Sequence, residues 1–99
     1  MTYVVVARYR TLPGKEDEVL ALLDTMAEAS RQEPDNLQYR VHRSTEDPRT
    51  VVLYEEYEAE SGFDAHCATD HFRDLVLGRV VPLLEHREVL RLTPREARA

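Results

Sequence analysis

The sequence has few of the residues on which many redox, metal and nucleotide sites depend. Its 99 residues include one cysteine, no tryptophan and three glycines. The single cysteine, Cys67, excludes an intramolecular disulfide and a thiolate-rich metal site. Gly14, Gly62 and Gly78 belong to no phosphate-binding loop, so we expect neither a dinucleotide nor ATP as cofactor. No apolar run approaches the roughly 18 residues of a membrane span.

Positive charge is also scarce. The chain has 19 acidic and 13 basic side chains and a net charge of -6. This balance argues against nucleic acid and against an anionic membrane surface as partners. Residues 1–6 (MTYVVV) lack the basic segment and the cleavage site of a signal peptide, so the expected location is the cytoplasm.

Length and composition predict a single domain over residues 1–99. Hydrophobic residues make up 42% of the chain, which is enough for one modest core. We expect this core over about residues 3–92 and a frayed, charged tail over residues 93–99. A chain of this size buries only about two-thirds of its unfolded surface, which favours oligomerisation.

The first half of the chain has the pattern of a strand, a helix and a hairpin. Residues 3–10 are rich in β-branched and aromatic side chains, as is typical of a strand. Residues 15–32 carry apolar side chains at helical spacing, at Val19, Leu22, Leu23 and Met26. Residues 37–41 alternate between apolar and polar side chains, and residues 51–57 form a second β-rich run. The turn between them contains proline, which predicts a β-hairpin.

The second half predicts two helical segments and a last strand. Ser61 and Asp64 match a capping box, so a helix is expected to start there. Thr69 is expected to cap a further helical segment, which Pro82 ends or kinks. Residues 85–92 are expected to form a strand, which carries Val89, Leu90 and Leu92.

The order β-α-β-β-α-β predicts a ferredoxin-like α+β fold, with a four-stranded antiparallel sheet covered by helices on one face. The other face is expected to carry Val52 and Tyr54, together with Val4 and Val6 or the alternate residues of the first strand, and it is too apolar for water. The simplest cover is a second copy of the chain. We therefore predict a homodimer.

Four segments resemble motifs of the antibiotic biosynthesis monooxygenase family. Residues 33–39 (EPDNLQY) resemble E-P-G-x-L-x-Y/F, and residues 52–57 (VLYEEY) resemble a strand of the form φ-L-Y-E-x-Y/W, where φ is an apolar residue. Residues 65–72 (AHCATDHF) resemble A-H-x-x-T-P-H-F, and residues 12–15 (LPGK) resemble the usual strand-to-helix turn. Order and spacing fit over most of the chain, although aspartate replaces the usual Gly in the first motif and the usual Pro in the third.

The resemblance implies a dimeric α+β barrel with a ligand cavity between the helices and the sheet of each protomer. Family members include cofactor-free monooxygenases of phenols and quinols, haem-degrading enzymes, and an isomerase of the phosphorylated autoinducer-2 signal. The absence of tryptophan weighs against the haem-degrading branch, which typically uses an Asn-Trp-His set. The resemblance therefore predicts the fold but does not identify the reaction.

Three residues are candidates for proton transfer. Glu55 shares an otherwise apolar strand face with Leu53 and Tyr57, so it is either a proton acceptor or a structural hydrogen-bond partner. His66 and His71 are candidate proton shuttles, with a satisfied core or surface histidine as the alternative. They are five residues apart, which is not the spacing of a helical metal pair, so we expect no metal site.

Aromatic side chains are the candidates for substrate binding, although such rings are more often plain core. They are Tyr39, Tyr57, Phe63 and Phe72. Cys67 is expected to be a buried, inert thiol. His42 and His86 are expected at the surface or in a dimer contact.

The chain is therefore predicted to be a cofactor-independent monooxygenase that uses dioxygen on a phenol, quinol or polyketide-like small molecule. A deprotonated phenol can itself reduce dioxygen, so the protein need only hold the ring, exclude water and accept the proton. One alternative is an isomerase of a small phosphorylated ketone, with Arg40 or Arg73 as the anion anchor. The other is a non-catalytic dimer that binds a small ligand.

Overall fold

The order of strands and helices along the chain agrees with the order predicted from the sequence. A computed structural model describes residues 2–95, and residue 1 and residues 96–99, at the end of the predicted charged tail, lie outside the described part. The elements are β1 (Tyr3–Thr11), α1 (Glu16–Ser30), β2 (Asn36–Arg43), β3 (Thr50–Tyr57), α2 (Glu60–Cys67), the π-helix η1 (Phe72–Val80), the 3₁₀ turn η2 (Val81–Leu83) and β4 (Leu84–Leu92). No helix in this part of the chain has the length and apolar character needed to cross a bilayer.

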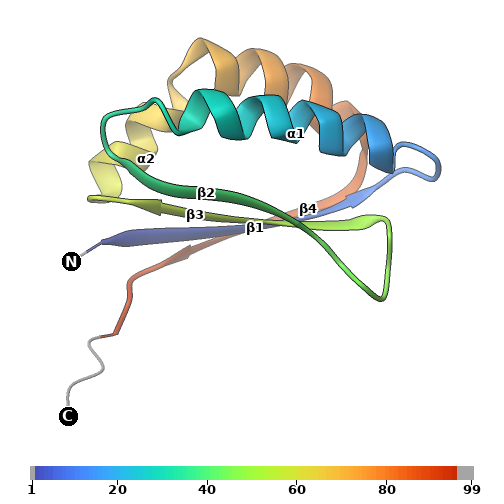
Figure 1. The fold of residues 1–99 in the computed structure, drawn as a ribbon, viewed down its shortest axis with the longest axis horizontal. Helices are drawn as coiled ribbons and strands as arrows, with labels where there is room; N and C mark the ends of the chain where they lie inside the picture. Colours follow the sequence, from blue (N-terminus) through green and yellow to red (C-terminus); the bar gives the residue numbers. More distant parts are fainter. Residues whose placement is uncertain (1, 96–99) are drawn as a thin grey trace.

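The four strands form one antiparallel sheet in the order β2-β3-β1-β4. All the helices lie over one face of this sheet, and the opposite face has no helix on it (Figure 1). The predicted ferredoxin-like fold is thus confirmed. Its two edge strands, β2 and β4, lie on opposite sides of the central pair.

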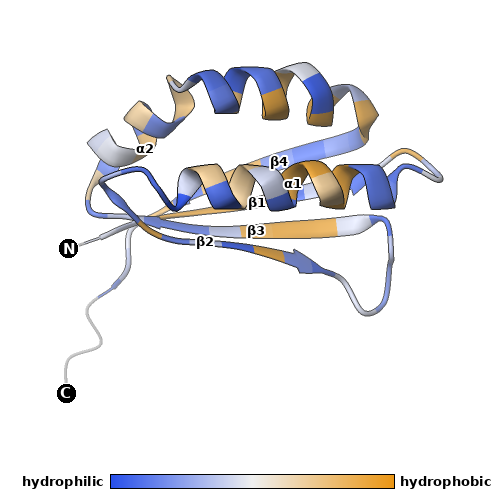
Figure 2. Ribbon diagram, turned by 45° about the horizontal axis from the view of Figure 1, so that its top comes forward, coloured by the Kyte–Doolittle hydropathy of each residue, from blue (hydrophilic) through white to orange (hydrophobic). Residues whose placement is uncertain are grey.

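The alternation along β3 separates the two faces of the sheet. Val51, Leu53 and Tyr57 are buried under the helices, whereas Val52 and Tyr54 are only partly buried on the other face. On α1, the fully buried side chains recur at helical spacing and pack into the same core as Val51 and Leu53, at Val19, Leu23 and Met26. Bands of hydrophobic and hydrophilic residues alternate along the helices in Figure 2. The face assignments made from the sequence are therefore confirmed.

The start of α2 differs from the prediction. The helix begins at Glu60, and the extended residue Ala59 takes the cap position with no side-chain hydrogen bond. Ser61 lies inside the first turn rather than before it, so the predicted capping box of Ser61 and Asp64 is wrong. The backbone makes the turn instead, because the Gly62 N–H donates to the Ala59 carbonyl at 3.0 Å.

The predicted cap at Thr69 is present, but the helix that follows is of an unexpected type. The Phe72 N–H donates to the Thr69 hydroxyl at 3.1 Å. Phe72–Val80 is a π-helix, and Val76 and Val80 are its buried residues. Pro82 ends it in a short 3₁₀ turn that leads into β4. Periodicity did not distinguish a π-helix from an α-helix, because both place residues four apart near one face.

The face of the sheet without helices carries a cluster of apolar side chains, which we call the outer apolar face. It consists of Val4, Val6, Val52, Tyr54, Leu90 and Leu92. Across the strands, Val6 lies opposite Tyr54 and Leu90, Val4 lies opposite Leu92, and Val52 lies opposite Arg8. Leu90 and Leu92 are 46% and 42% exposed. Apolar side chains gathered in this way are typical of an interaction surface rather than of a face in contact with water.

Candidate active site

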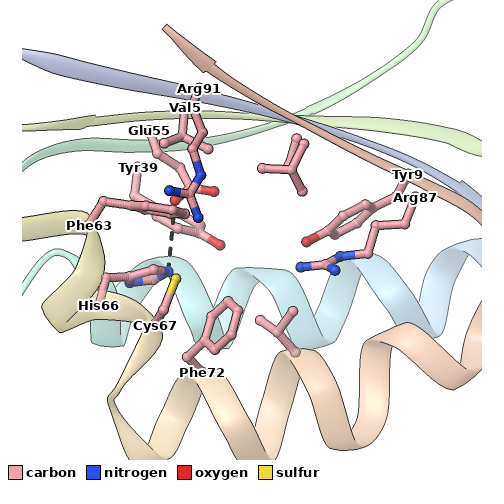
Figure 3. Close-up of a pocket in the computed structure, with 13 residues that line it drawn as sticks. Val5, Tyr9, Tyr39, Glu55, Phe63, His66, Cys67, Phe72, Arg87 and Arg91 are labelled. Atoms are coloured by element: carbon pink, nitrogen blue, oxygen red, sulfur yellow. Dashed lines mark ion pairs between the residues drawn. The ribbon is translucent and has the colours of Figure 1, made fainter. Parts of the chain in front are cut away.

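A cavity of about 280 Å³ lies between the inner face of the sheet and the segment from α2 to η1. Its walls combine aromatic rings with ionisable groups (Figure 3). Phe63 and Phe72 come from the helical side, and Tyr9 and Tyr39 come from the sheet. A small, largely apolar pocket with a few convergent polar groups is the usual form of a small-molecule site.

Glu55 lies in the wall that the sheet contributes. It is 4% exposed, and its neighbours across the sheet are Val5 on β1 and Tyr39 on β2. The Tyr57 hydroxyl donates a hydrogen bond of 2.7 Å to its Oε1. Burial raises the pKa of Glu55 to about 7, and the Tyr57 hydrogen bond opposes this rise. The carboxyl group can therefore exchange a proton near neutral pH.

His66 faces Glu55 from α2. Only 1% of its surface is exposed, and its Nε2 lies 3.8 Å from the Glu55 Oε1. Its Nδ1 lies 3.0 Å from Oε2 of Glu33. An ionised carboxylate only accepts hydrogen bonds, so Nδ1 carries the proton and Nε2 of the neutral ring has a lone pair on the Glu55 side. Burial lowers the pKa of His66, and the Glu33 carboxylate opposes this effect.

Glu33, in the loop after α1, connects His66 to the surface. Its Oε2 also accepts a hydrogen bond of 2.6 Å from Nε2 of His71. The Glu33 side chain is 13% exposed and the His71 side chain 27%. Glu33 belongs to the EPDNLQY segment, but no role was predicted for it, because a loop carboxylate has no periodicity that shows which way it points.

The same three side chains are the groups in the described part of the chain that could hold a metal ion. One donor atom each from Glu33, His66 and His71 lies within 4.8 Å of the others. The spacing of the two histidines gave no sign of this cluster, because its carboxylate comes from a distant loop. Both imidazoles already donate to that carboxylate, so a cation would have to displace two hydrogen bonds.

Of the predicted substrate-binding residues, Tyr39, Phe63 and Phe72 line the cavity. Tyr57 does not line it and instead supports Glu55 with its hydroxyl. Burial raises the pKa of Tyr39, so its hydroxyl stays neutral. Among the proton-transfer candidates, Glu55 and His66 line the cavity, whereas His71 lies outside it and contacts Glu33.

Cys67 also lines the cavity but is only half-buried, so the expected full burial is not observed. Burial still raises the pKa of its thiol, which stays protonated at neutral pH. His42 and His86 are exposed, as expected from the sequence.

Neither arginine suggested as an anion anchor lies at the cavity. Arg40 neighbours Tyr54 on the outer side of the sheet. Arg73 is 56% exposed and pairs with Asp70. Two other arginines, Arg87 and Arg91 of β4, line the cavity, and neither was predicted from the sequence.

A comparison with protein families matches residues 2–76 to the model described as "Antibiotic biosynthesis monooxygenase". The curated relatives include YcnE of Bacillus subtilis, whose name proposes a monooxygenase activity. It is 29% identical over 73 residues, which cover 74% of this chain and 77% of YcnE. The chain spans half the length of another relative, the uncharacterised protein sll1783 of Synechocystis, with 27% identity over 73 residues.

Solved structures agree with the fold over nearly the whole chain. Rv0793 from Mycobacterium tuberculosis is 26% identical with a TM-score of 0.90, and the match covers 100% of both chains. A crystal structure described as an antibiotic biosynthesis monooxygenase is 31% identical with a TM-score of 0.88. That match covers 94% of this chain and 98% of the other.

Proposed function

The chain belongs to the antibiotic biosynthesis monooxygenase family, and on this premise we propose that it is a cofactor-independent monooxygenase that oxidises a phenol or quinol with dioxygen. The observation that carries the proposal is the Glu55–His66 pair, because it offers buried proton acceptors at the wall of an aromatic-lined cavity. Proton acceptors in a cavity that holds a ring and excludes water are what such a reaction requires of a protein.

The proposed reaction begins with the phenolic O–H directed at Glu55 and His66. Transfer of the proton to the carboxylate, or to the lone pair on Nε2 of His66, leaves an electron-rich phenolate. The phenolate passes one electron to dioxygen, and the superoxide and ring radicals combine to a peroxide at a ring carbon that bears hydrogen. Loss of water then leaves a ring carbonyl, so one oxygen atom stays in the product and the other leaves as water with two substrate hydrogens.

Glu55 suits the first step because burial places its pKa at about 7. A general base is most effective when its pKa lies near the working pH. His66 stays neutral because burial lowers its pKa, and Glu33 fixes which nitrogen faces the cavity. Glu33 is therefore a positioning residue that acts through His66.

Oxygen uptake over a panel of phenols and quinols tests the proposal, with Glu55→Gln as the variant and Arg73→Gln as a matched control away from the cavity. General bases typically contribute about 10²–10⁴-fold, so we expect a loss of this order in Glu55→Gln and none in the control. Circular dichroism and sedimentation check that fold and assembly are kept. Unchanged turnover with a lower melting temperature in Glu55→Gln would instead make Glu55 a structural brace, and no uptake with any substrate contradicts the monooxygenase proposal.

Enolisation of a small phosphorylated ketone is a second candidate function. The observation in its favour is the presence of Arg87 and Arg91 at the cavity, because a phosphate group needs cationic partners. Glu55 would then move a proton between two carbons rather than take it from a hydroxyl group. Isomerisation in the absence of oxygen distinguishes this reaction from the oxygenase reaction.

We also propose that the outer apolar face is covered by a second copy of the chain. Burial of each large apolar side chain is worth roughly 1.5–3 kcal/mol. Tyr54→Glu places a charge in this face and is expected to weaken the dimer. Leu77→Glu is the matched control, because Leu77 is 45% exposed on η1, away from that face. Sedimentation that finds a stable monomer at micromolar concentration, or a Tyr54→Glu variant with unchanged assembly, contradicts the proposal.

A further inference from the structure

Two exposed arginines of β4, Arg87 and Arg91, lie on the side of the sheet that the helices cover. The pairing of β4 with β1 sets Arg87 opposite Tyr9 and Arg91 opposite Val5, and both of these β1 residues are buried on the inner face. Arg87 and Arg91 therefore lie on the side of the sheet that carries Glu55. Figure 3 shows both guanidinium groups directed into the cavity, with Arg87 beside the Tyr9 hydroxyl.

These two arginines lack the close ionic partners that other arginines have. Arg10 lies 2.6 Å from Glu85, and Arg73 pairs with Asp70. Within residues 2–95, no carboxylate oxygen lies within 4.0 Å of Arg87. Arg91 reaches Glu60 only at 4.0 Å, and because both side chains are more than half exposed this pair contributes little.

Aromatic rings contact the two groups, and Glu55, which lines the same cavity, lies beyond 4.0 Å of both, although the charge of Arg87 lowers the pKa of Glu55. The Arg87 guanidinium carbon lies 6.0 Å from the centre of the Tyr9 ring, and that of Arg91 lies 5.1 Å from the centre of the Phe63 ring. Such contacts orient a guanidinium but leave most of its N–H donors free. In a chain with a net charge of -6, two arginines without close acidic partners at one cavity form a local site of positive potential.

We propose that the cavity binds a small acid, whose carboxylate or phosphate group is held at Arg87 and the Tyr9 hydroxyl, with Arg91 at the opposite end of the same wall. The orientation proposed for the rest of this small acid rests on the proposed function. Its reacting hydroxyl would lie at Glu55 and His66, across the cavity from Arg87. The volume of about 280 Å³ lies just below the usual range for ligand pockets, so it favours a single ring over a polycyclic molecule.

Calorimetric titration of the full chain tests the charge requirement without any need for turnover. The probes are 2,5-dihydroxybenzoate, its neutral analogue 2,5-dihydroxybenzamide, and dihydroxyacetone phosphate. We expect the acid to bind at least about tenfold more tightly than the amide, because charge-assisted hydrogen bonds are about twice as strong as neutral ones. Arg87→Gln should remove this difference, and Arg87→Lys should keep part of it. Arg73→Gln, outside the cavity, should leave it unchanged.

The results of this titration distinguish a carboxylate ligand from a phosphate ligand, and they distinguish both from a cavity that has no anion site. Tight binding of the phosphate alone, with the same dependence on Arg87, supports the anion site and identifies phosphate as its ligand. Equal binding of acid and amide, a preference that survives Arg87→Gln combined with Arg91→Gln, or no binding of any probe at millimolar concentration overturns the proposal. In those cases the arginines would only prevent β4 from pairing with a strand of another molecule, as inward-pointing charges on edge strands do.

The outcomes also distinguish this inference from the proposed function. Binding of the acid through Arg87 without oxygen uptake supports the anion site and contradicts the oxygenase. Oxygen uptake that is equally fast with acid and amide contradicts the anion site and supports the oxygenase.

Discussion

The ionisation of Glu55 has a direct consequence for the stability of the fold. Burial raises its pKa from an ordinary value of 4.5 to about 7. The folded state therefore holds a proton that the unfolded state has lost between these two pH values. The stabilising contribution of the neutral carboxyl is complete below about pH 4.5 and is lost as the pH rises through about 7. At 1.36 kcal/mol per pKa unit, the loss amounts to roughly 3 kcal/mol.

Glu55→Gln isolates this contribution, because glutamine resembles the neutral carboxyl and its carbonyl oxygen can still accept the Tyr57 hydrogen bond. The free energy of unfolding of the variant minus that of the wild type should increase by roughly 3 kcal/mol between about pH 4.5 and pH 8. His66 acts in the opposite direction, since its lowered pKa makes folding less favourable as the pH falls below 6.5. Taking the difference between the two proteins removes most of this second contribution.

Urea denaturation followed by circular dichroism from pH 4.5 to 8 measures the difference, at fixed protein concentration because a dimer would couple assembly to stability. Tyr57→Phe is the companion variant. The Tyr57 hydrogen bond lowers the pKa of Glu55, so its removal should move the loss of stability to higher pH. A difference between Glu55→Gln and the wild type that stays constant over this range would refute the reasoning, because it would show that the buried carboxyl titrates at its ordinary pH.

Two further predictions concern groups near the cavity. Glu33→Gln removes the carboxylate that raises the pKa of His66, so an NMR titration should find this pKa lower than in the wild type, and an unchanged value would mean that the contact is absent in solution. Gly62→Ala would place a Cβ atom 2.7 Å from the Cβ of Asp35, so thermal denaturation should show a loss of about 1–3 kcal/mol. A variant as stable as the wild type would show that the loop carrying Asp35 moves freely away.

Much of the fold could be predicted from the sequence, because it depends on patterns that repeat over many residues. The alternation along residues 51–57 identified the inner and outer faces of β3, and the helical spacing around Leu23 identified the buried side of α1. Single local signals were less reliable. Ser61 and Asp64 had the right spacing for a cap, but the extended residue Ala59 takes the cap position, two residues before Ser61.

Only part of the candidate site could be predicted, because some of its residues belong to no repeating pattern. Glu55 stood out because it interrupts an apolar strand face, and His66 because it shares a helix face with Phe63. Glu33 could not be identified in this way, since its place beside His66 depends on how the loop after α1 returns to the sheet. Arg87 was missed because β4 is an edge strand with both faces exposed, so its alternation does not show which face is inner.

The π-helix η1 gives the cavity wall an unusual tolerance to changes in chain length. A π-helix closes its hydrogen bonds over five residues rather than four, so it holds about one more residue in each turn than an α-helix. Its ends are fixed separately, by the Thr69 cap at the start and by Pro82 beyond the end. Deletion of one residue at the exposed Gly78 or Arg79 would let about one turn of this segment close as an α-helical turn between the same two ends. An indel in this segment would therefore reshape the cavity beside Phe72 and Val76 while leaving the topology intact, which is a route by which one scaffold can acquire pockets for different substrates.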